Sequence, residues 1–559
     1  MKISKALLKQ IVFALILLIV VNVVAGFVFK RFDLTNDKRY TLSDATKNLL
    51  LKVKQPMVID VLLQGDDLPS EFRKLQVETK QLLEELSAVN PNIKFTFINP
   101  INNPDKSDEI INRLGQLGLT PANVTIEDGG KVTQELVFPW AMAYIDESKP
   151  ERIALLKNKL GSDSETRVNN SIQQLEYAFA SAIKKLTVTN KKKIAVIKGN
   201  GELPNIEIAD FLRELGGYYN LAPITLDSVQ NSPQKTLNIL NAYDLAIIAK
   251  PTEAFTDLEK YVMDQYTMQG GKSVWLIDQV VAEMDSLYAN QGKTIAALRD
   301  LNLNDLFFKY GVRINPVLVN DMYFTQIVLA TGQGSNTQYN PVPWVYYPMV
   351  FSPETHPVNT NIEAVRFQFA NSIDTLKNAI KKTVLLRSSP LSKLTGTPSE
   401  INLGIITNPA PKETYNNGNQ PLAVLLEGNF TSVFKNRVKP FAFKNTIENG
   451  AETKMIVIAD GDLIKNQVKQ GRPLELGYDK WTNSFYGNKE FLLNCVNYLL
   501  DDTGLINIRS KKIAVPFLDK EKITAQKSGW TLVNVVLPLV LLVIFGWLFS
   551  LYRRKKYVS

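Results

Sequence analysis

The stretch KIAVIKGNGE, residues 193–202, is a continuous apolar strand that runs directly into a glycine-rich turn. Similar apolar runs follow at Leu245–Ala249 and Ser273–Ile277. The helical pattern of Thr256–Gln269 lies between those two and stops at a glycine pair. Strands that are apolar at every position are buried on both faces, which is typical of a parallel sheet with helices on either side. The sequence therefore predicts a doubly wound α/β domain.

Later apolar runs fit the same sheet, so we assign residues 189–515 to this domain. Its closing helix is predicted at Lys489–Leu500, and Cys495 lies on the apolar face of that helix as a buried thiol. The later strands are predicted at Thr383–Leu386, Leu422–Leu426 and Met455–Ala459.

Between about residues 312 and 380 the regular pattern is lost, which predicts an irregular insertion. Its segment NPVPWVYYP, residues 340–348, combines prolines with aromatic side chains. Two interpretations stay open: an exposed loop that binds a ligand, or a segment packed over the sheet edge, which we favour slightly. Trp344, Tyr346 and Tyr347 are the candidate ligand-binding residues of this segment.

Polar residues follow three of the apolar strands, at the sheet edge where α/β folds bind ligands. Glycine and aspartate at such places more often form turns and cap helices, and we favour that interpretation. For Asp460 and Asp462, the alternative is that they form the pair of carboxylates of a carbohydrate-active enzyme. The candidate ligand-binding residues are Gly199, Asn200, Gly201, Glu202, Asp278, Asp460 and Asp462.

The chain lacks the residues that common catalytic and metal sites need. It has one cysteine, Cys495, and one histidine, His356, so neither an intrachain disulfide nor a multi-histidine zinc site can form. No G-x-S-x-G follows the strands, and no phosphate-binding loop G-x-x-x-x-G-K-[ST] is present. The net charge of +9 is spread along the chain, which argues against nucleic acid as a partner. We predict no catalytic residue, no metal and no cofactor, and therefore not an enzyme.

Residues 32–188 are predicted to form a juxtamembrane segment and a smaller α/β domain. A helix over residues 44–54 follows a cap at Thr41 or Ser43. The elements behind it run β-α-β-α-β-β-α, as in thioredoxin, with Pro121 where that fold carries a cis-proline. No C-x-x-C motif is present, so a redox role is not expected.

An apolar run of about 20 residues near each end is long enough to cross a bilayer. The runs are Ile11–Phe29 and Trp530–Leu551, and the basic tail Arg553–Lys556 predicts that both termini are cytoplasmic. A cleaved signal peptide is the less favoured interpretation of the first run. The remaining predicted segments are a cytoplasmic N-terminal tip with the first transmembrane helix over residues 1–31 and a linker over residues 516–529. The second transmembrane helix is predicted over residues 530–552 and a basic cytoplasmic tail over residues 553–559.

Three segments and the two-anchor layout resemble the GldG family of gliding-motility proteins. The segments are residues 32–43 (FDLTNDKRYTLS), the turn at residues 199–202 and residues 340–348. The resemblance implies a periplasmic auxiliary subunit of an ABC transporter in the cell inner membrane, acting with a permease and an ATPase. It also implies a glutamine-amidotransferase-like sheet domain, related to one in an intraflagellar transport protein and suggested to bind sugars. Asn200 departs from the histidine of many relatives.

Asn22 and Asn534 lie inside the predicted spans, where polar side chains often bond to neighbouring helices, so they are candidate partner contacts. Three functions stay open. The favoured one is a non-catalytic transporter subunit whose ectodomain binds or relays to an envelope polysaccharide or protein. The others are an envelope scaffold without a transporter and, least favoured, the carbohydrate-active enzyme.

Overall fold

The computed structural model describes residues 13–20, 41–65, 68–102, 107–128, 131–146, 150–157, 162–332, 336–510 and 520–557. The chain divides into two compact units, residues 1–511 and residues 512–559. The segment 32–40 and Asn22 lie outside the described residues, as does most of the first predicted span, of which residues 13–20 are helical.

The first unit begins with a small α/β domain. Strand order in its main sheet is β2-β1-β5-β6, with β1 and β2 parallel and the other pairs antiparallel. Ser43 caps the first helix by accepting a hydrogen bond from the Thr46 amide. The elements are α2 (Asp44–Leu50), β1 (Met57–Val61), α3 (Ser70–Val89), β2 (Ile93–Phe97), α4 (Ser107–Gln116), β3 (Ala122–Asp128), β4 (Lys131–Val137), β5 (Trp140–Ile145), β6 (Glu151–Ala154) and α5 (Ser164–Thr187).

The predicted order of elements is found in this domain, with two corrections. Where the predicted order has one strand after β3, the structure has two, β4 and β5, divided at Phe138-Pro139, and β4 pairs only with β3 in a separate hairpin. Proline lacks the N–H that a continuous ladder needs, which accounts for the break. The Thr120–Pro121 peptide is trans, so the cis-proline prediction is wrong.

The second domain is built on a seven-stranded sheet of order β19-β22-β23-β10-β9-β7-β8. The strands β8, β7, β9, β10 and β23 are parallel neighbours. The elements are β7 (Lys193–Lys198), α6 (Ala209–Tyr218), β8 (Asn220–Thr225), α7 (Pro233–Leu240), β9 (Leu245–Ala249), α8 (Asp257–Met268), β10 (Lys272–Leu276), β19 (Lys381–Arg387), β22 (Pro421–Thr431), β23 (Asn449–Ile458) and α11 (Asn488–Leu500).

The sheet is mixed, which corrects the prediction of a parallel sheet. β22 runs antiparallel to both of its neighbours, β19 and β23. The residues between β22 and β23 contain no helix, and without a helical crossover a strand that pairs with the preceding one returns in the opposite direction. The continuous apolar run of each strand was identifiable, but the sequence carries no equally direct signal of strand direction.

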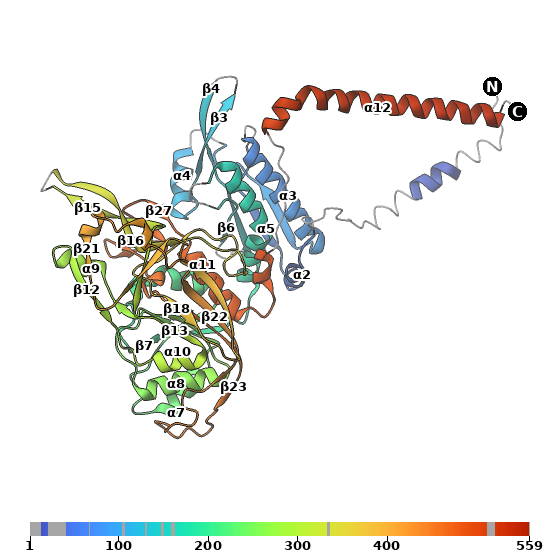
Figure 1. The fold of residues 1–559 in the computed structure, drawn as a ribbon. Coiled ribbons are helices and arrows are strands. Elements are labelled where there is room, and N and C mark those ends of the chain that lie inside the picture. The colour runs from blue at the N-terminus through green and yellow to red at the C-terminus, as the bar shows by residue number, and fades with distance from the viewer. Residues whose placement is uncertain are drawn as a thin grey trace. The chain divides into compact units, whose positions relative to one another are not determined.

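Apolar side chains cover both faces of this sheet. Along β9, Leu245 and Ile247 belong to a core that includes α6 and α11, whereas Ala246 and Ile248 belong to a second core with α7, α8 and α10. The latter three helices lie together on one side of the sheet (Figure 1). Cys495 is fully buried on α11, as predicted.

The predicted irregular insertion is a β-rich lobe, so that interpretation is wrong. Prolines concealed its longest strand, which tolerates them at Pro341 and Pro343 because it pairs there only with β15. The lobe and its flanks contain β11 (Val280–Val281), α9 (Met284–Ala289), β12 (Lys293–Leu298), α10 (Asn304–Tyr310), β13 (Val312–Ile314), β14 (Val317–Asp321), β15 (Phe324–Thr331), β16 (Gln338–Val350), β17 (Val365–Arg366), β18 (Ile373–Thr375), β20 (Ser392–Gly396) and β21 (Ser399–Asn402).

An ionic contact joins the two domains. Lys157, after β6, donates to Glu490 Oε1 on α11 at 2.5 Å, and Arg509 Nη2 donates to the same oxygen at 2.8 Å. The Arg509 guanidinium also lies 4.9 Å from the ring centroid of Tyr177 on α5. Burial alone would raise the pKa of Glu490, but the two cations hold it at about 2. We call Lys157, Glu490 and Arg509 the junction cluster.

The second unit contains a single long helix, α12 (Lys520–Tyr557). It begins inside the predicted linker and continues through the basic tail, so the helix is longer than the predicted span. Residues 525–556 are apolar and long enough to cross a membrane, and among the described residues this is the one helix that meets that criterion.

Candidate functional site

Three neighbouring strands bring buried charges together at the carboxyl edge of the large sheet. β9 ends before Lys250, β10 before Ile277 and Asp278, and β23 before Asp460 and Asp462. Because β9, β10 and β23 are adjacent and parallel, these positions meet at one edge. The structure therefore brings together three of the predicted aspartates and adds a lysine.

Lys250 is at the centre of this group and its side chain is only 3% exposed. Its Nζ lies 2.7 Å from Asp462 Oδ1, 2.8 Å from Glu283 Oε1 and 3.4 Å from Asp278 Oδ2. Glu283 comes from the segment between β11 and α9. We call Lys250, Asp278, Glu283 and Asp462 the Lys250 cluster.

The backbone at the cluster is held in unusual geometry. Lys250 has a backbone φ of 54°, a left-handed conformation that residues other than glycine seldom adopt. Its N–H donates to Leu276 O, which ties it to the next strand. A Cβ on Gly461 would lie 2.5 Å from Lys250 Cγ, so only glycine fits beside this side chain.

Carboxylates outnumber cations in the Lys250 cluster, and the pKa values respond to that imbalance. Burial would lower the pKa of Lys250, but Asp462, Asp278 and Glu283 raise it, so the ammonium stays charged. Burial raises the pKa of Asp278 to about 6; Lys250 opposes the rise and Asp462 adds to it. Asp278 therefore changes charge near neutral pH.

Asp460 is fully buried and serves the backbone. Its Oδ1 accepts from the Asp462 N–H at 2.7 Å and its Oδ2 from the Gln368 N–H at 2.5 Å. Burial, followed by the charges of Asp278 and Asp462, raises its pKa well above the usual range. Asp460 thus forms the turn interactions that we favoured for it. The Asp462 carboxylate forms an ion pair with Lys250.

The three carboxylates of the Lys250 cluster could in principle coordinate a metal ion, because their oxygens lie within 4.8 Å of one another. Lys250 Nζ already lies among them and supplies the positive charge that such oxygens require. The donor set as arranged therefore suits an internal ammonium rather than a metal.

The turn Gly199–Glu202 lies between the ends of β7 and β9 and is bonded to the protein itself. The Asn200 carbonyl accepts from the Thr252 and Glu253 amides, and the Asn200 side chain donates to Glu259 at the start of α8 at 3.3 Å. Glu202 accepts from the Asn200 N–H at 2.9 Å. These contacts agree with the turn-and-cap interpretation.

The aromatic candidates are buried. Trp344, Tyr346 and Tyr347 pack with Phe369 in the core of the β-rich lobe, with ring centroids 5.2–6.5 Å apart where they meet. The exposed-loop interpretation is therefore wrong, and the packing interpretation is the one found.

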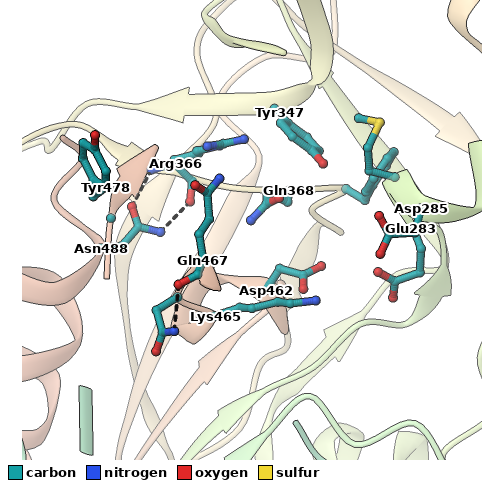
Figure 2. A pocket seen from close by; sticks show the side chains of 14 residues that line it. Glu283, Asp285, Tyr347, Arg366, Gln368, Asp462, Lys465, Gln467, Tyr478 and Asn488 are labelled. Atoms are coloured by element: carbon teal, nitrogen blue, oxygen red, sulfur yellow. Dashed lines mark hydrogen bonds between the residues drawn. The ribbon is translucent and has the colours of Figure 1, made fainter. Parts of the chain in front are cut away.

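A cavity of about 160 Å³ lies beside the Lys250 cluster (Figure 2). Two cluster members, Glu283 and Asp462, face it, and the buried Tyr347 reaches it from the β-rich lobe. The lining residues are Glu283, Met284, Asp285, Tyr347, Arg366, Gln368, Phe369, Asp462, Lys465, Asn466, Gln467, Gly477, Tyr478 and Asn488.

Sequence reasoning missed Lys250, Glu283 and Arg366. One signal for Lys250 was available: a charged residue directly after the wholly apolar strand Leu245–Ala249 stands at the ligand-binding edge of a sheet. Glu283 and Arg366 belong to the lobe whose strands were not predicted, so nothing in the sequence placed them near the edge.

Of the two membrane candidates, Asn22 lies outside the described residues. Asn534 lies on α12, exposed, and its side chain forms no hydrogen bond within the described part of the chain. Thr531, three residues earlier, donates to the Lys527 carbonyl of its own helix at 2.8 Å.

The sheet domain with its polar edge cavity, together with the apolar helix of membrane-crossing length among the described residues, indicates a membrane-associated α/β protein. A family model described as an ABC-type uncharacterized transport system, of the auxiliary kind, matches residues 191–495. That is more than half of the chain, so the chain belongs to this family. A domain of unknown function (DUF7088) matches residues 36–144.

Two solved structures are similar in part. The N-terminal domain of mmIFT52 is 14% identical with a TM-score of 0.31, and the match covers 58% of this chain and 100% of that one. A ThuA-like protein from Parabacteroides merdae is 11% identical with a TM-score of 0.25, covering 59% and 93%. Both TM-scores are too low to carry an argument. No curated protein matches the chain.

Proposed function

We propose that the protein is a non-catalytic auxiliary subunit that works with the permease and the ATPase of an ABC transporter. The family match over residues 191–495 is the observation that carries this proposal. The absence of a nucleotide-binding loop from the sequence supports it, because ATP hydrolysis then has to come from a partner.

The proposal includes a topology. Two spans, Ile11–Phe29 and α12, anchor the chain in the cell inner membrane with both termini in the cytoplasm and residues between them in the periplasm. The four basic residues Arg553–Lys556 support this orientation, since short basic flanks stay cytoplasmic. In this arrangement residues 32–188 form a thioredoxin-like domain and residues 189–515 a glutamine-amidotransferase-like domain that binds or relays to an envelope ligand or partner.

A role in gliding motility is the most specific part of the proposal. It rests on the juxtamembrane string of residues 32–43 and on residues 340–348, the segments that resemble the GldG family. Loss of gliding on deletion of the gene, with restoration by the intact chain, would support it; normal gliding of the deletion strain would refute this part alone.

Co-purification tests the transporter role. The tagged chain, extracted from native membranes, is expected to bring down a multi-span permease and an ATPase. Asn534→Leu is expected to reduce that recovery several-fold, because the amide has no partner within its own helix. Thr531→Val is the matched control, since the Thr531 hydroxyl is already bonded to Lys527 O. Recovery of the chain with envelope proteins but no ATPase would favour the scaffold alternative instead.

A further inference from the structure

The cavity beside the Lys250 cluster has an acidic side and a basic side. Figure 2 shows Glu283 and Asp285 on one side, Arg366 on the other, and Gln368 between them. The acidic residues come from the start of α9, which precedes the insertion, and the basic one comes from β17 within it, so two separate parts of the chain supply the two sides.

Some polar groups of the lining are already committed to the protein. The Asn488 side chain accepts from the Arg366 N–H at 2.9 Å and donates to the Arg366 carbonyl at 2.8 Å. Gln467 accepts from the Lys480 N–H and donates to Asp479. These two side chains hold the wall in place.

Other groups in the cavity remain available. Within the described residues, the Asp285 carboxylate and the Gln368 side chain form no hydrogen bond or ion pair. The buried Nε of Arg366 has no acceptor either, although its Nη1 lies 3.3 Å from Asp479. A guanidinium held between the rings of Tyr347 and Tyr486, at 5.0 and 5.7 Å, is fixed in orientation.

The charge on each side selects a different group. On the acidic side, Glu283 is paired with Lys250 at 2.8 Å and lies 4.0 Å from Arg299, whereas the Asp285 carboxylate has no partner within the described residues. Glu283, whose side chain is 34% exposed, and Asp285 present carboxylates to the cavity, which Lys465, paired with Glu207, also lines. On the other side, Arg366 is paired with Asp479 through Nη1, so its unpaired Nε is the donor that remains for a ligand carboxylate.

Size limits the ligand to a small molecule. At roughly 30 Å³ for a water molecule, the cavity holds about five waters. A molecule with an ammonium and a carboxylate a few bonds apart fits that space.

We propose that this cavity binds a small zwitterion of the α-amino acid type, with its ammonium toward Glu283 and Asp285 and its carboxylate toward Arg366, across the Gln368 amide. The proposal rests on the ligand-binding part of the proposed function and names its ligand class. Co-purification with the ATPase does not depend on the cavity. A negative result in the ligand-binding test therefore does not affect the conclusion from co-purification, and the reverse also holds.

Calorimetric titration of the full chain in detergent separates the two ends of the ligand. The probes are glycine, L-alanine, L-serine and L-leucine, followed by the amide and the N-acetyl derivative of whichever binds best. At least one amino acid is expected to bind, and both derivatives are expected to bind at least tenfold more weakly, because each has lost one charge. The proposal would be overturned if none of the four amino acids showed measurable binding, or if the amide and the N-acetyl derivative bound as tightly as the amino acid. Tighter binding of glucose than of the amino acids would also overturn it.

Asp285→Asn tests the acidic side in the same assay. The exposed Asp285 side chain forms no contact that the fold needs, so the variant is expected to fold. It should weaken the amino acid and its amide at least fivefold and leave the N-acetyl derivative unchanged, since only the first two carry the ammonium. Glu452→Gln, an exposed carboxylate on β23, is the matched control. Equal loss for all three ligands would contradict the assigned orientation.

Discussion

Two buried ionic clusters in this protein hold opposite balances of charge. The Lys250 cluster places one cation among three carboxylates at the carboxyl edge of the large sheet, with Arg299 at its margin, 4.0 Å from Glu283. The junction cluster places one carboxylate, Glu490, between two cations, where the two domains meet. Both clusters consist of carboxylates in direct contact with ammonium or guanidinium groups. They differ in the ratio of carboxylates to cations.

That stoichiometry decides how each cluster responds to pH. The pKa of Glu490, at about 2, is below the usual 4.5, so its stabilising effect is complete above about pH 4.5 and is lost as the pH falls toward 2. The pKa of Asp278, at about 6, is above the usual 3.8, so its contribution is greatest below about pH 3.8 and is lost as the pH rises through 6. The junction is therefore constant across neutral pH, whereas the sheet edge is not.

The comparison separates a structural contact from a site. In the junction cluster both cations also contact other protein groups: Arg509 donates to the Thr360 carbonyl at 2.9 Å and Lys157 to Gln174 at 2.8 Å. In the Lys250 cluster, Glu283 and Asp462 line a cavity next to Asp285, whose carboxylate has no partner within the described residues. A surplus charge at a cavity is costly to keep unless something else supplies its partner.

Removal of the central carboxylate at the junction should have the largest effect. Glu490→Gln leaves the buried Arg509 and the partly exposed Lys157 without an anion, a change that we expect to cost about 3 kcal/mol, the lower end of the range for buried pairs. We expect amides of α5 and α11 to lose at least a hundredfold of their hydrogen-exchange protection at pH 7.

The control for Glu490→Gln is Glu448→Gln, which removes the exposed partner of Lys439 and should leave exchange unchanged. Undiminished protection in Glu490→Gln would mean that the junction cluster does not hold the domains together.

Removal of the central cation at the sheet edge should cost less, about 2–3 kcal/mol at pH 7.5. In Lys250→Met three carboxylates lose their cation, but Asp278 can take up a proton in response. The loss of thermal stability should therefore shrink when the same variant is heated at pH 5. A loss that is equal at both pH values would contradict the role of Asp278 as the group that adjusts.

Gly461 tests how closely the edge is packed. Gly461→Ala places a methyl group 2.5 Å from Lys250 Cγ and 3.1 Å from Asp278 Oδ2, so we expect it to destabilise the domain by about 1–3 kcal/mol. Gly216→Ala on α6 has open space around its new methyl group and should be neutral or slightly stabilising. If thermal unfolding shows the two variants to be alike, the edge is looser than these distances indicate.

The sequence was sufficient for the parts of this molecule that repeat a simple pattern. The apolar runs at Leu245–Ala249 and Ser273–Ile277 predicted two neighbouring strands of the large sheet, and Asp278, Asp460 and Asp462 were expected at its carboxyl edge because parallel strands end there. Burial on both faces leaves a run of apolar residues that is hard to mistake.

The β-rich lobe could not be predicted in the same way. Its strand β16 contains Pro341, Pro343 and Pro348, which disfavour a strand in any local pattern and are tolerated only where a neighbour is missing or the ladder is irregular. Glu283 and Arg366 reach the cavity through that lobe, and their positions follow from tertiary pairing of short strands that have no periodicity of their own. The positions of Glu283 and Arg366 in the cavity wall therefore could not be predicted from sequence patterns.

The smallest effect should come from Asp278, and it tests the origin of the pH response directly. Between pH 5 and pH 7 the ionisation of this carboxyl, with a pKa of about 6 in the folded protein and 3.8 when unfolded, should lower the free energy of unfolding by about 1 kcal/mol. Asp278→Asn keeps an oxygen for the Gly461 N–H and cannot ionise, so the variant should lack that decrease. The measurement is the difference between the two stability–pH curves, which removes the contributions of all other groups, His356 included. Parallel curves would show that Asp278 keeps one protonation state throughout, and that the surplus charge of the Lys250 cluster is fixed rather than adjustable.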